Sequence, residues 1–268
     1  MTTSYLDRGE GRVGYDVQGE GPLVVCLPGM GDLRSVYRHT VAALVAAGFR
    51  VATMDLRGHG DSDATFVSYD DVAAGSDALA LIDHLGGPAV VIGNSMGAGA
   101  AVWAAAEAPA KIAGLALVGP FVRDGKPNPV LMLALRLLLV RPWGPGAWRT
   151  YYRKAYPGRP PSDLSEHLTR LGQSLARPGR WRAFVKTTRT SHAPAEARLG
   201  RVQAPALVVM GTKDQDWPDA TAEARFVAGA LHGELVLVPD AGHYPQAEYP
   251  ELVNPALVAF AGKVTAGA

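Results

Sequence analysis

Residues 89–97 read Ala-Val-Val-Ile-Gly-Asn-Ser-Met-Gly, and this stretch decides the fold. Its first four residues are apolar and predict a buried strand, and an Ala-rich helix is predicted to begin at Met96. Gly93 and Gly97 lie two residues on either side of Ser95, so strand and helix can approach each other across a sharp turn. Such a turn exposes the Ser95 hydroxyl, and the start of the following helix favours developing negative charge beside it.

Strand and helix signals alternate on both sides of this turn. Short apolar runs predict further strands at residues 23–27, 50–54, 115–118, 206–210 and 234–238. Apolar residues at helical spacing predict helices at residues 35–47, 72–85, 96–107 and 252–264. Nearly continuous apolar strands that alternate with helices are typical of a mostly parallel sheet with helices on both faces. The sequence therefore predicts the α/β class.

Two further polar residues directly follow predicted strands. Asp214 comes 119 residues after Ser95, and His243 comes 29 residues after Asp214. The carboxyl ends of parallel strands meet at one edge of a sheet, so we expect all three side chains to lie there. Ser, then Asp, then His is also the chain order of one known arrangement for nucleophilic catalysis. In it, His243 would take the proton of Ser95, and Asp214 would orient the imidazole and stabilise its charged form.

Together these motifs resemble the α/β-hydrolase family, most closely its single-domain esterases and lipases with a helical cap. The similarity extends from Leu23 to about Val264. It rests on Pro28-Gly29-Met30, the loop 55–62, the turn 93–97, Gly211 to Asp214 with Pro218, and Gly242-His243. Many relatives have His-Gly where this chain has Pro28-Gly29, but the glycine that allows the loop to turn is retained.

The resemblance implies an oxyanion hole formed by the backbone N–H groups of Met30 and Met96. The second assignment also follows from the turn itself, because the residue after the nucleophile begins a helix with a free N–H. Relatives that resemble haloalkane dehalogenases or epoxide hydrolases carry Asp at the nucleophile position. Ser95 indicates acyl transfer through a covalent acyl-enzyme instead.

Three other residues could be mistaken for catalytic ones. Asp216 lies two residues after Asp214, but the Gly-x-x-Asp-x-x-x-Pro spacing favours Asp214 as the acid. Asp124 follows an earlier strand and is the rarer alternative acid. His59 lies in Arg-Gly-His-Gly, which we interpret as a structural turn.

The region from residue 123 to residue 198 lacks strand signals and is predicted to be a helical cap, or lid, inserted between two strands. We expect residues 1–122 and 199–268 to form the α/β-hydrolase core. The insertion holds 15 Lys or Arg against four acidic residues, which gives +11, and the remaining 11 basic and 21 acidic residues give −10. Its apolar residues are predicted to face Ser95 and to favour medium or apolar acyl groups over acetyl: Leu131, Met132, Leu135, Leu138 and Leu139.

Composition excludes several other classes of protein. The single Cys26 lies in an apolar strand, so neither a disulfide framework nor a thiolate metal cluster is expected. No nucleotide-binding motif is complete, and nothing requires a metal or an organic cofactor. The longest apolar stretch, residues 130–140, is too short for a membrane span, and no signal peptide is recognised, so a cytoplasmic protein is expected. The acidic core argues against nucleic acid as a partner.

The sequence thus predicts a cofactor-independent serine hydrolase of the carboxylesterase type, acting on a small-molecule ester with a small-to-medium apolar acyl group. A thioesterase, lactonase, carbon–carbon hydrolase or perhydrolase would use the same three residues, so these reactions stay open. A ligand-binding receptor on a hydrolase fold is the alternative from another class. The basic insertion favours either a solvated surface or an anionic substrate or carrier.

Overall fold

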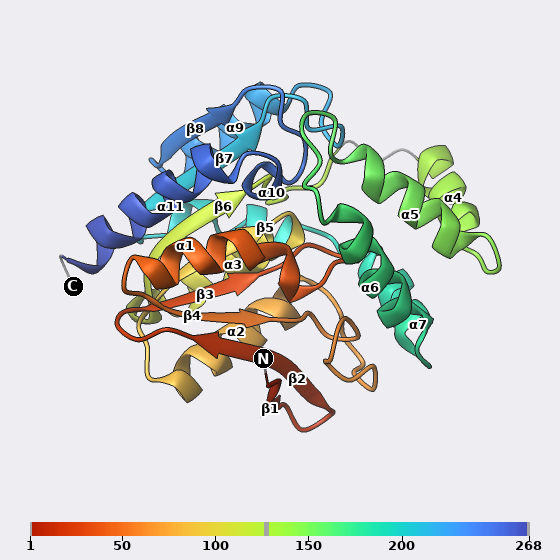
Figure 1. Ribbon diagram of the computed structural model, residues 1–268, viewed down its shortest axis with the longest axis horizontal. Coiled ribbons are helices and arrows are strands. Elements are labelled where there is room, and N and C mark those ends of the chain that lie inside the picture. The colour runs from red at the N-terminus through yellow and green to blue at the C-terminus, as the bar shows by residue number, and fades with distance from the viewer. Residues whose placement is uncertain (1, 126–128, 267–268) are drawn as a thin grey trace.

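The computed structural model describes residues 2–125 and 129–266 and is built around an eight-stranded sheet. The strands lie in the order β1-β2-β4-β3-β5-β6-β7-β8 (Figure 1). Only the β1–β2 and β2–β4 pairs are antiparallel, so the predicted mostly parallel sheet is confirmed. The strands are β1 (Ser4–Asp7), β2 (Arg12–Gln18), β3 (Leu23–Leu27), β4 (Arg50–Met54), β5 (Ala89–Asn94), β6 (Ile112–Val118), β7 (Ala206–Gly211) and β8 (Glu234–Val238).

Helices cover both faces of this sheet, and each face has its own cluster of buried apolar side chains. On one face the clustered side chains come from α1 (Arg38–Ala46) and α11 (Pro250–Thr265). On the other they come from α2 (Asp71–Leu85), α3 (Met96–Glu107) and α9 (Ala220–Ala230). Burying a large aliphatic side chain contributes about 1.5–3 kcal/mol, so these two clusters stabilise most of the fold. Cys26 is fully buried in the first cluster, as expected for an inert residue, and burial raises the pKa of its thiol.

The helical segment between β6 and β7, residues 123–198, is called the insertion below. It contains α4 (Pro129–Leu138), α5 (Gly144–Lys154), α6 (Leu164–Ala176), α7 (Arg180–Thr187) and α8 (Ala193–Glu196). Figure 1 shows α4 to α7 gathered beyond one edge of the sheet, with α4 at the outer end. The helix α5 begins at Gly144, and Pro145 lies in its first turn, where proline is favoured.

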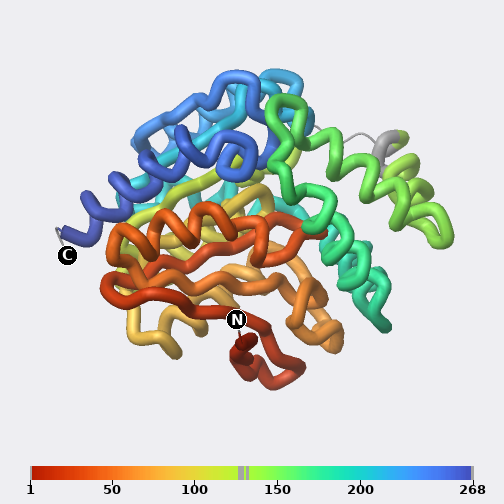
Figure 2. Tube along the Cα trace, in the orientation of Figure 1, coloured from red at the N-terminus to blue at the C-terminus, as the bar shows by residue number. Residues whose placement is uncertain are grey.

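The prediction that the apolar residues of α4 face Ser95 is wrong for two of the five residues. The side chains of Leu135 and Leu138 are 36% and 49% exposed, whereas Leu139 is buried. The side chains of Leu131 and Met132 lie outside the described residues. The tube in Figure 2 shows the reason, because α4 lies at the far side of the insertion from the sheet.

Several elements carry no apolar run and were not predicted. The strand β1 lies at one edge of the sheet and β2 lies between β1 and β4; polar residues interrupt both strands, and Tyr5 and Val17 on them are exposed. The helix α9 is rich in Ala and is capped by Asp219, whose carboxylate accepts a hydrogen bond from the Ala222 N–H. The remaining elements are α10 (Pro245–Glu248) and three 3₁₀ turns, η1 (Arg34–Tyr37), η2 (Pro109–Lys111) and η3 (Leu199–Arg201). Among the described residues, no helix is long and apolar enough to cross a membrane.

Candidate active site

Ser95 lies on the predicted sharp turn between β5 and α3. Its backbone has φ 55° and ψ −123°, a region that side chains other than glycine rarely adopt. A Cβ atom on Gly93 would lie 2.3 Å from the Gly97 carbonyl oxygen, and one on Gly97 would lie 2.3 Å from the Leu27 carbonyl oxygen. The two glycines are therefore required by close packing of the strand, the helix and the neighbouring β3. Ser95 itself is 7% exposed.

Asp214 and His243 are brought into direct contact by the loops that follow β7 and β8. Nδ1 of His243 lies 2.7 Å from Oδ2 of Asp214, and both side chains are almost completely buried. A buried carboxylate next to Nδ1 fixes the tautomer that leaves Nε2 free to accept a proton.

The loops that carry Ser95 and His243 are tied together by neighbouring groups. The Asn94 side-chain amide donates to the His243 carbonyl oxygen at 3.2 Å, and the Phe121 backbone N–H donates to the Ser95 carbonyl oxygen at 3.2 Å. The Phe121 ring also meets the His243 ring edge to face. Within residues 2–125 and 129–266, the Ser95 hydroxyl has no hydrogen-bond partner. Catalytic hydrogen bonds in unliganded sites are often long and tighten when substrate binds.

A second carboxylate, Asp216, lies beside the same imidazole. Its Oδ2 is 3.4 Å from Nδ1 of His243, and its backbone N–H donates to Asp214 at 3.0 Å. The Tyr151 hydroxyl of α5 donates to the other oxygen of Asp216. Burial by itself lowers the pKa of His243, but Asp214 and Asp216 outweigh it and raise the pKa to about 9. Burial also raises the pKa of Asp216.

The other two candidate residues lie elsewhere. Asp124 accepts hydrogen bonds from the Ser191 hydroxyl and the His192 backbone N–H, so it is engaged within the insertion rather than with His243. His59 is buried and accepts a hydrogen bond from the Gly31 N–H at Nε2, while Nδ1 faces the Arg57 carbonyl oxygen. Burial lowers the pKa of His59 to about 4, so it is a neutral support for the loop that contains Met30.

The backbone donors implied for an oxyanion hole flank the Ser95 turn. Met96 is the first residue of α3, so its N–H has no acceptor within the helix. Met30 precedes Gly31, which has a positive φ of 66° and whose carbonyl oxygen accepts from the Trp148 indole N–H at 3.1 Å. The loop is thus held by His59 on one side and by the insertion on the other.

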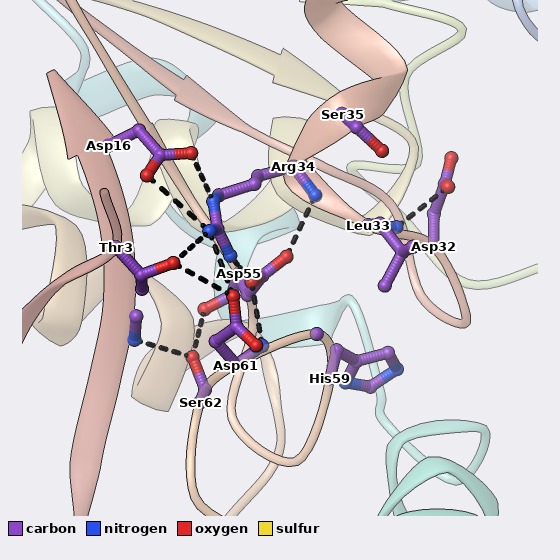
Figure 3. A network of polar contacts seen from close by, with 12 residues as sticks. Thr3, Asp16, Asp32, Leu33, Arg34, Ser35, Asp55, His59, Asp61 and Ser62 are labelled. Carbon is purple, nitrogen blue, oxygen red and sulfur yellow. Dashed lines mark hydrogen bonds and ion pairs between the residues drawn. The ribbon is translucent and has the colours of Figure 1, made fainter. Parts of the chain in front are cut away.

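Arg34 lies four residues after Met30, and Figure 3 shows its side chain among three carboxylates. Its guanidinium pairs with Asp16, Asp55 and Asp61 at the boundary between β2, β4 and the loop 55–62. Asp55 is completely buried and also accepts from the backbone N–H groups of Arg34 and Asp61. Burial raises the pKa of Asp55, and the Arg34 charge opposes that rise. The cluster supports the fold, because Arg34 joins β2 to the loop 55–62 through these three carboxylates.

The insertion contacts the His243 loop directly. The His243 backbone N–H donates to the Ala155 carbonyl oxygen at 3.0 Å. Glu248 joins the two segments, since its carboxylate accepts from Gly242 at 2.5 Å and from Gly158 at 2.9 Å.

Two buried Asp–His pairs complete the attachment of the insertion to the core. They are Asp32–His167 at 2.8 Å and Asp71–His192 at 2.7 Å. Tyr152 of α5 also donates to Asp32 at 2.7 Å. These contacts were not predicted from the sequence, because helical spacing in the insertion does not reveal which face of a helix meets the core.

Aromatic side chains enclose the space around the oxyanion loop and the imidazole. Trp148 packs on Phe184 at 4.7 Å between ring centroids, and Phe121 packs on Trp217 at 4.6 Å. A cavity of about 930 Å³ lies next to Arg34, and another of about 660 Å³ lies between α5 and α6. Ser95 lines neither cavity. The candidate site is therefore defined by the contacts among its side chains.

One cluster in the described part of the chain has the spacing of a metal site. It consists of Asp214, Asp216 and His243, whose potential ligand atoms all lie within 4.8 Å of one another. The Nδ1 atom that would bind a metal is already hydrogen-bonded to Asp214, and this contact accounts for the cluster without an ion.

Comparisons with known proteins identify the family of the chain. Residues 24–256 match the family model described as the alpha/beta hydrolase family. The chain is 32% identical to 2-hydroxy-6-oxononadienedioate/2-hydroxy-6-oxononatrienedioate hydrolase 2 of Pseudomonas putida, over 92% of this chain and 90% of the relative.

Two solved structures are similar over nearly the whole chain. The enol-lactonase from Burkholderia xenovorans LB400 has a TM-score of 0.80 and 25% identity, and the match covers 96% of this chain and 99% of the lactonase. An esterase from Exiguobacterium antarcticum has a TM-score of 0.85 and 19% identity, over 97% of this chain and all of the esterase. At this identity, the similarity to the esterase shows a shared fold only.

Proposed function

Because the chain belongs to the α/β hydrolase family, we propose that it is a serine hydrolase that cleaves carboxylic esters with a small-to-medium apolar acyl group. One observation carries this proposal. Asp214 and His243 form a buried hydrogen bond of 2.7 Å at the sheet edge where Ser95 occupies its strained turn. A nucleophile, a base and an orienting acid are the three groups that acyl transfer through a serine requires.

In the proposed reaction, Nε2 of His243 accepts the hydroxyl proton of Ser95 while Oγ attacks the ester carbonyl carbon. The resulting tetrahedral oxyanion is stabilised by the backbone N–H groups of Met30 and Met96. The intermediate collapses, the bond to the alkoxy group breaks, and His243 gives the proton to the departing alcohol. Water then attacks the acyl-enzyme by the same route, which releases the acid and restores Ser95.

We propose that the insertion serves as the cap of this site, over a core formed by residues 1–122 and 199–268. Trp148 supports this role, because it donates to the carbonyl oxygen of Gly31 in the oxyanion loop and packs on Phe184. An apolar acyl group suits these aromatic walls, which replace the α4 side chains that the sequence suggested for this purpose.

A second candidate reaction is the hydrolysis of an anionic dicarboxylate. The 32% identical relative is named for a substrate that carries two carboxylates, and the insertion of this chain is basic. The same three residues would serve a carbon–carbon or lactone substrate, since each presents a carbonyl group to the nucleophile.

A substrate profile separates these candidates. We expect purified protein to hydrolyse nitrophenyl butyrate and hexanoate, with Ser95→Ala lacking nearly all turnover. Faster turnover of 2-hydroxy-6-oxononadienedioate than of every ester would establish the second reaction instead. No turnover on any of these substrates, together with no covalent labelling of Ser95 by a fluorophosphonate, would reject a serine hydrolase and favour a binding protein.

A further inference from the structure

Exposed apolar side chains are concentrated on α4 and the segment that follows it. Seven large apolar residues between positions 130 and 143 are 36–78% exposed. Most soluble proteins bury such residues, and a contiguous exposed group of them indicates an interaction surface. The group, called the α4 surface below, comprises Val130, Leu133, Leu135, Leu137, Leu138, Val140 and Trp143.

The same part of the chain carries an excess of positive charge, of which Arg159 is paired with Glu251. From residue 125 to residue 162 there are seven Lys or Arg and no Asp or Glu. Among the residues that the structure describes, Arg136 and Arg149 form neither an ion pair nor a side-chain hydrogen bond. Acidic residues elsewhere in the insertion are engaged, since Asp163 pairs with Arg38 and Glu166 pairs with Arg170. The cations beside the α4 surface are therefore free to bind anions.

The α4 surface lies at the positively charged end of the molecule. Figure 1 shows α4 at the outer end of the insertion, away from the sheet. The insertion has a net charge of +11 and the rest of the chain −10, so the molecule carries an electric dipole along this direction. Near an anionic surface, such a dipole turns the insertion inward and the acidic core outward.

We propose that the α4 surface docks on an anionic lipid bilayer, with its aliphatic side chains and Trp143 inserted at the level of the headgroups and its arginines bound to lipid phosphates. Exposed aliphatic residues, an interfacial Trp and unpaired cations are the features that hold a helix in the plane of a membrane interface. This surface is distinct from Ser95 and its partners, so the proposal does not depend on the proposed reaction.

A bilayer fits these observations better than a second copy of the chain. Symmetric pairing through the α4 surface would bring two segments of seven cations each together, and like charges oppose such contact. A protein partner would need a complementary groove for a protruding helix, whereas a bilayer accepts a convex apolar surface without one.

The test is flotation of the whole protein with vesicles, read as a partition coefficient without any turnover measurement. Vesicles of phosphatidylcholine with 30 mol% phosphatidylglycerol are compared with pure phosphatidylcholine at low salt. We expect binding to the anionic vesicles, weaker binding to the neutral ones, and a loss of binding as salt rises from about 0.01 to 0.1 M.

Variants in and outside the surface make the test specific. Leu133→Glu with Leu137→Glu should lower the partition coefficient at least tenfold, and Arg136→Gln should lower it about fivefold. The matched controls replace exposed residues of the core: Val67→Glu with Leu252→Glu, and Arg225→Gln. The controls should bind vesicles like the unaltered protein, and thermal melting checks that every variant is folded.

Three results would overturn the proposal. The first is no flotation of the unaltered protein with anionic vesicles. The second is an equal loss of binding in the core controls. The third is a concentration-dependent dimer, seen by sedimentation, that the Leu133 and Leu137 changes abolish while vesicle binding persists; the surface would then be an interface between copies of the chain.

Discussion

Replacement of Asp216 by Asn should move the pH dependence of the proposed reaction toward neutral pH. His243 must be neutral to accept the Ser95 proton, and its pKa is raised to about 9 by Asp214 and Asp216. The active fraction of free enzyme therefore falls as the pH falls through about 9, and at pH 7 only about 1% of the imidazole is neutral. Removing the Asp216 charge lowers this pKa and extends activity to lower pH.

The size of the shift follows from the distance between the two groups. Oδ2 of Asp216 lies 3.4 Å from Nδ1 of His243, and their side chains are 12% and 5% exposed. At the dielectric constant of water, two unit charges at this distance interact by about 1.2 kcal/mol, which corresponds to a change of about 0.9 in the pKa of His243. A less polarisable interior enlarges the interaction, so we expect a shift of at least about one unit. At pH 7 this would raise kcat/KM about tenfold.

The assay is kcat/KM for a nitrophenyl ester between pH 5 and pH 10, because this ratio reports the pKa values of free enzyme. Asn is the appropriate replacement, since its side-chain oxygen can still accept from the Tyr151 hydroxyl. Asp240→Asn is the matched control, because Asp240 lies on the His243 loop, pairs with Lys213 and is 62% exposed. The control should leave the profile in place.

Two outcomes would refute the reasoning. An unchanged acid limb in Asp216→Asn would show that this carboxylate does not set the pKa of His243. A loss of kcat/KM by three orders of magnitude or more at every pH would show that Asp216, rather than Asp214, orients the imidazole. Asp214→Asn should produce that large loss, by comparison with the effect of about 10⁴ in a serine protease triad.

Three further substitutions test the site and its supports. Ser95→Ala should abolish turnover and fluorophosphonate labelling with an unchanged melting temperature, and a labelled residue elsewhere by peptide mapping would reject the nucleophile. Arg34→Gln should lower the free energy of unfolding by about 3–5 kcal/mol in urea titrations, because it leaves the buried Asp55 unpaired; a loss below about 1 kcal/mol would contradict this. Gly31→Ala should displace Trp148, seen as altered tryptophan fluorescence and a raised KM, because the added Cβ would lie 2.4 Å from that ring; an unchanged spectrum and KM would show that the loop adapts.

The core of the fold was predictable because its strands are buried on both faces. Each of the parallel strands β3 to β7 contains an apolar run, so periodicity and turn residues located it in the sequence. The positions of Asp214 and His243 followed, since a residue just past a parallel strand lies at the carboxyl edge whatever its side-chain neighbours are. The strands β1 and β2 were missed because polar and exposed residues interrupt them, so neither contains a continuous apolar run.

The insertion shows where this kind of prediction fails. Its helices were located by their apolar spacing, but that spacing does not distinguish a face turned to the core from one turned to solvent. Leu135 and Leu138 were expected to face Ser95 and are exposed. No motif in the sequence marked Trp148 or Tyr151, yet Trp148 contacts the oxyanion loop and Tyr151 contacts Asp216. Such contacts depend on how α4 and α5 pack on the core, which is a tertiary property.

The contacts between the insertion and the His243 loop can influence the proposed reaction. The insertion reaches the imidazole by two routes, through the Ala155 carbonyl oxygen to the His243 backbone and through Tyr151 to Asp216. A change in the insertion can therefore alter the position and the pKa of the base as well as the shape of the substrate site. In the proposed reaction the core supplies Ser95, Asp214 and His243, and the insertion supplies groups that contact the oxyanion loop and Asp216. In the proposed reaction, the insertion would therefore act on reactivity and on specificity through the same side chains.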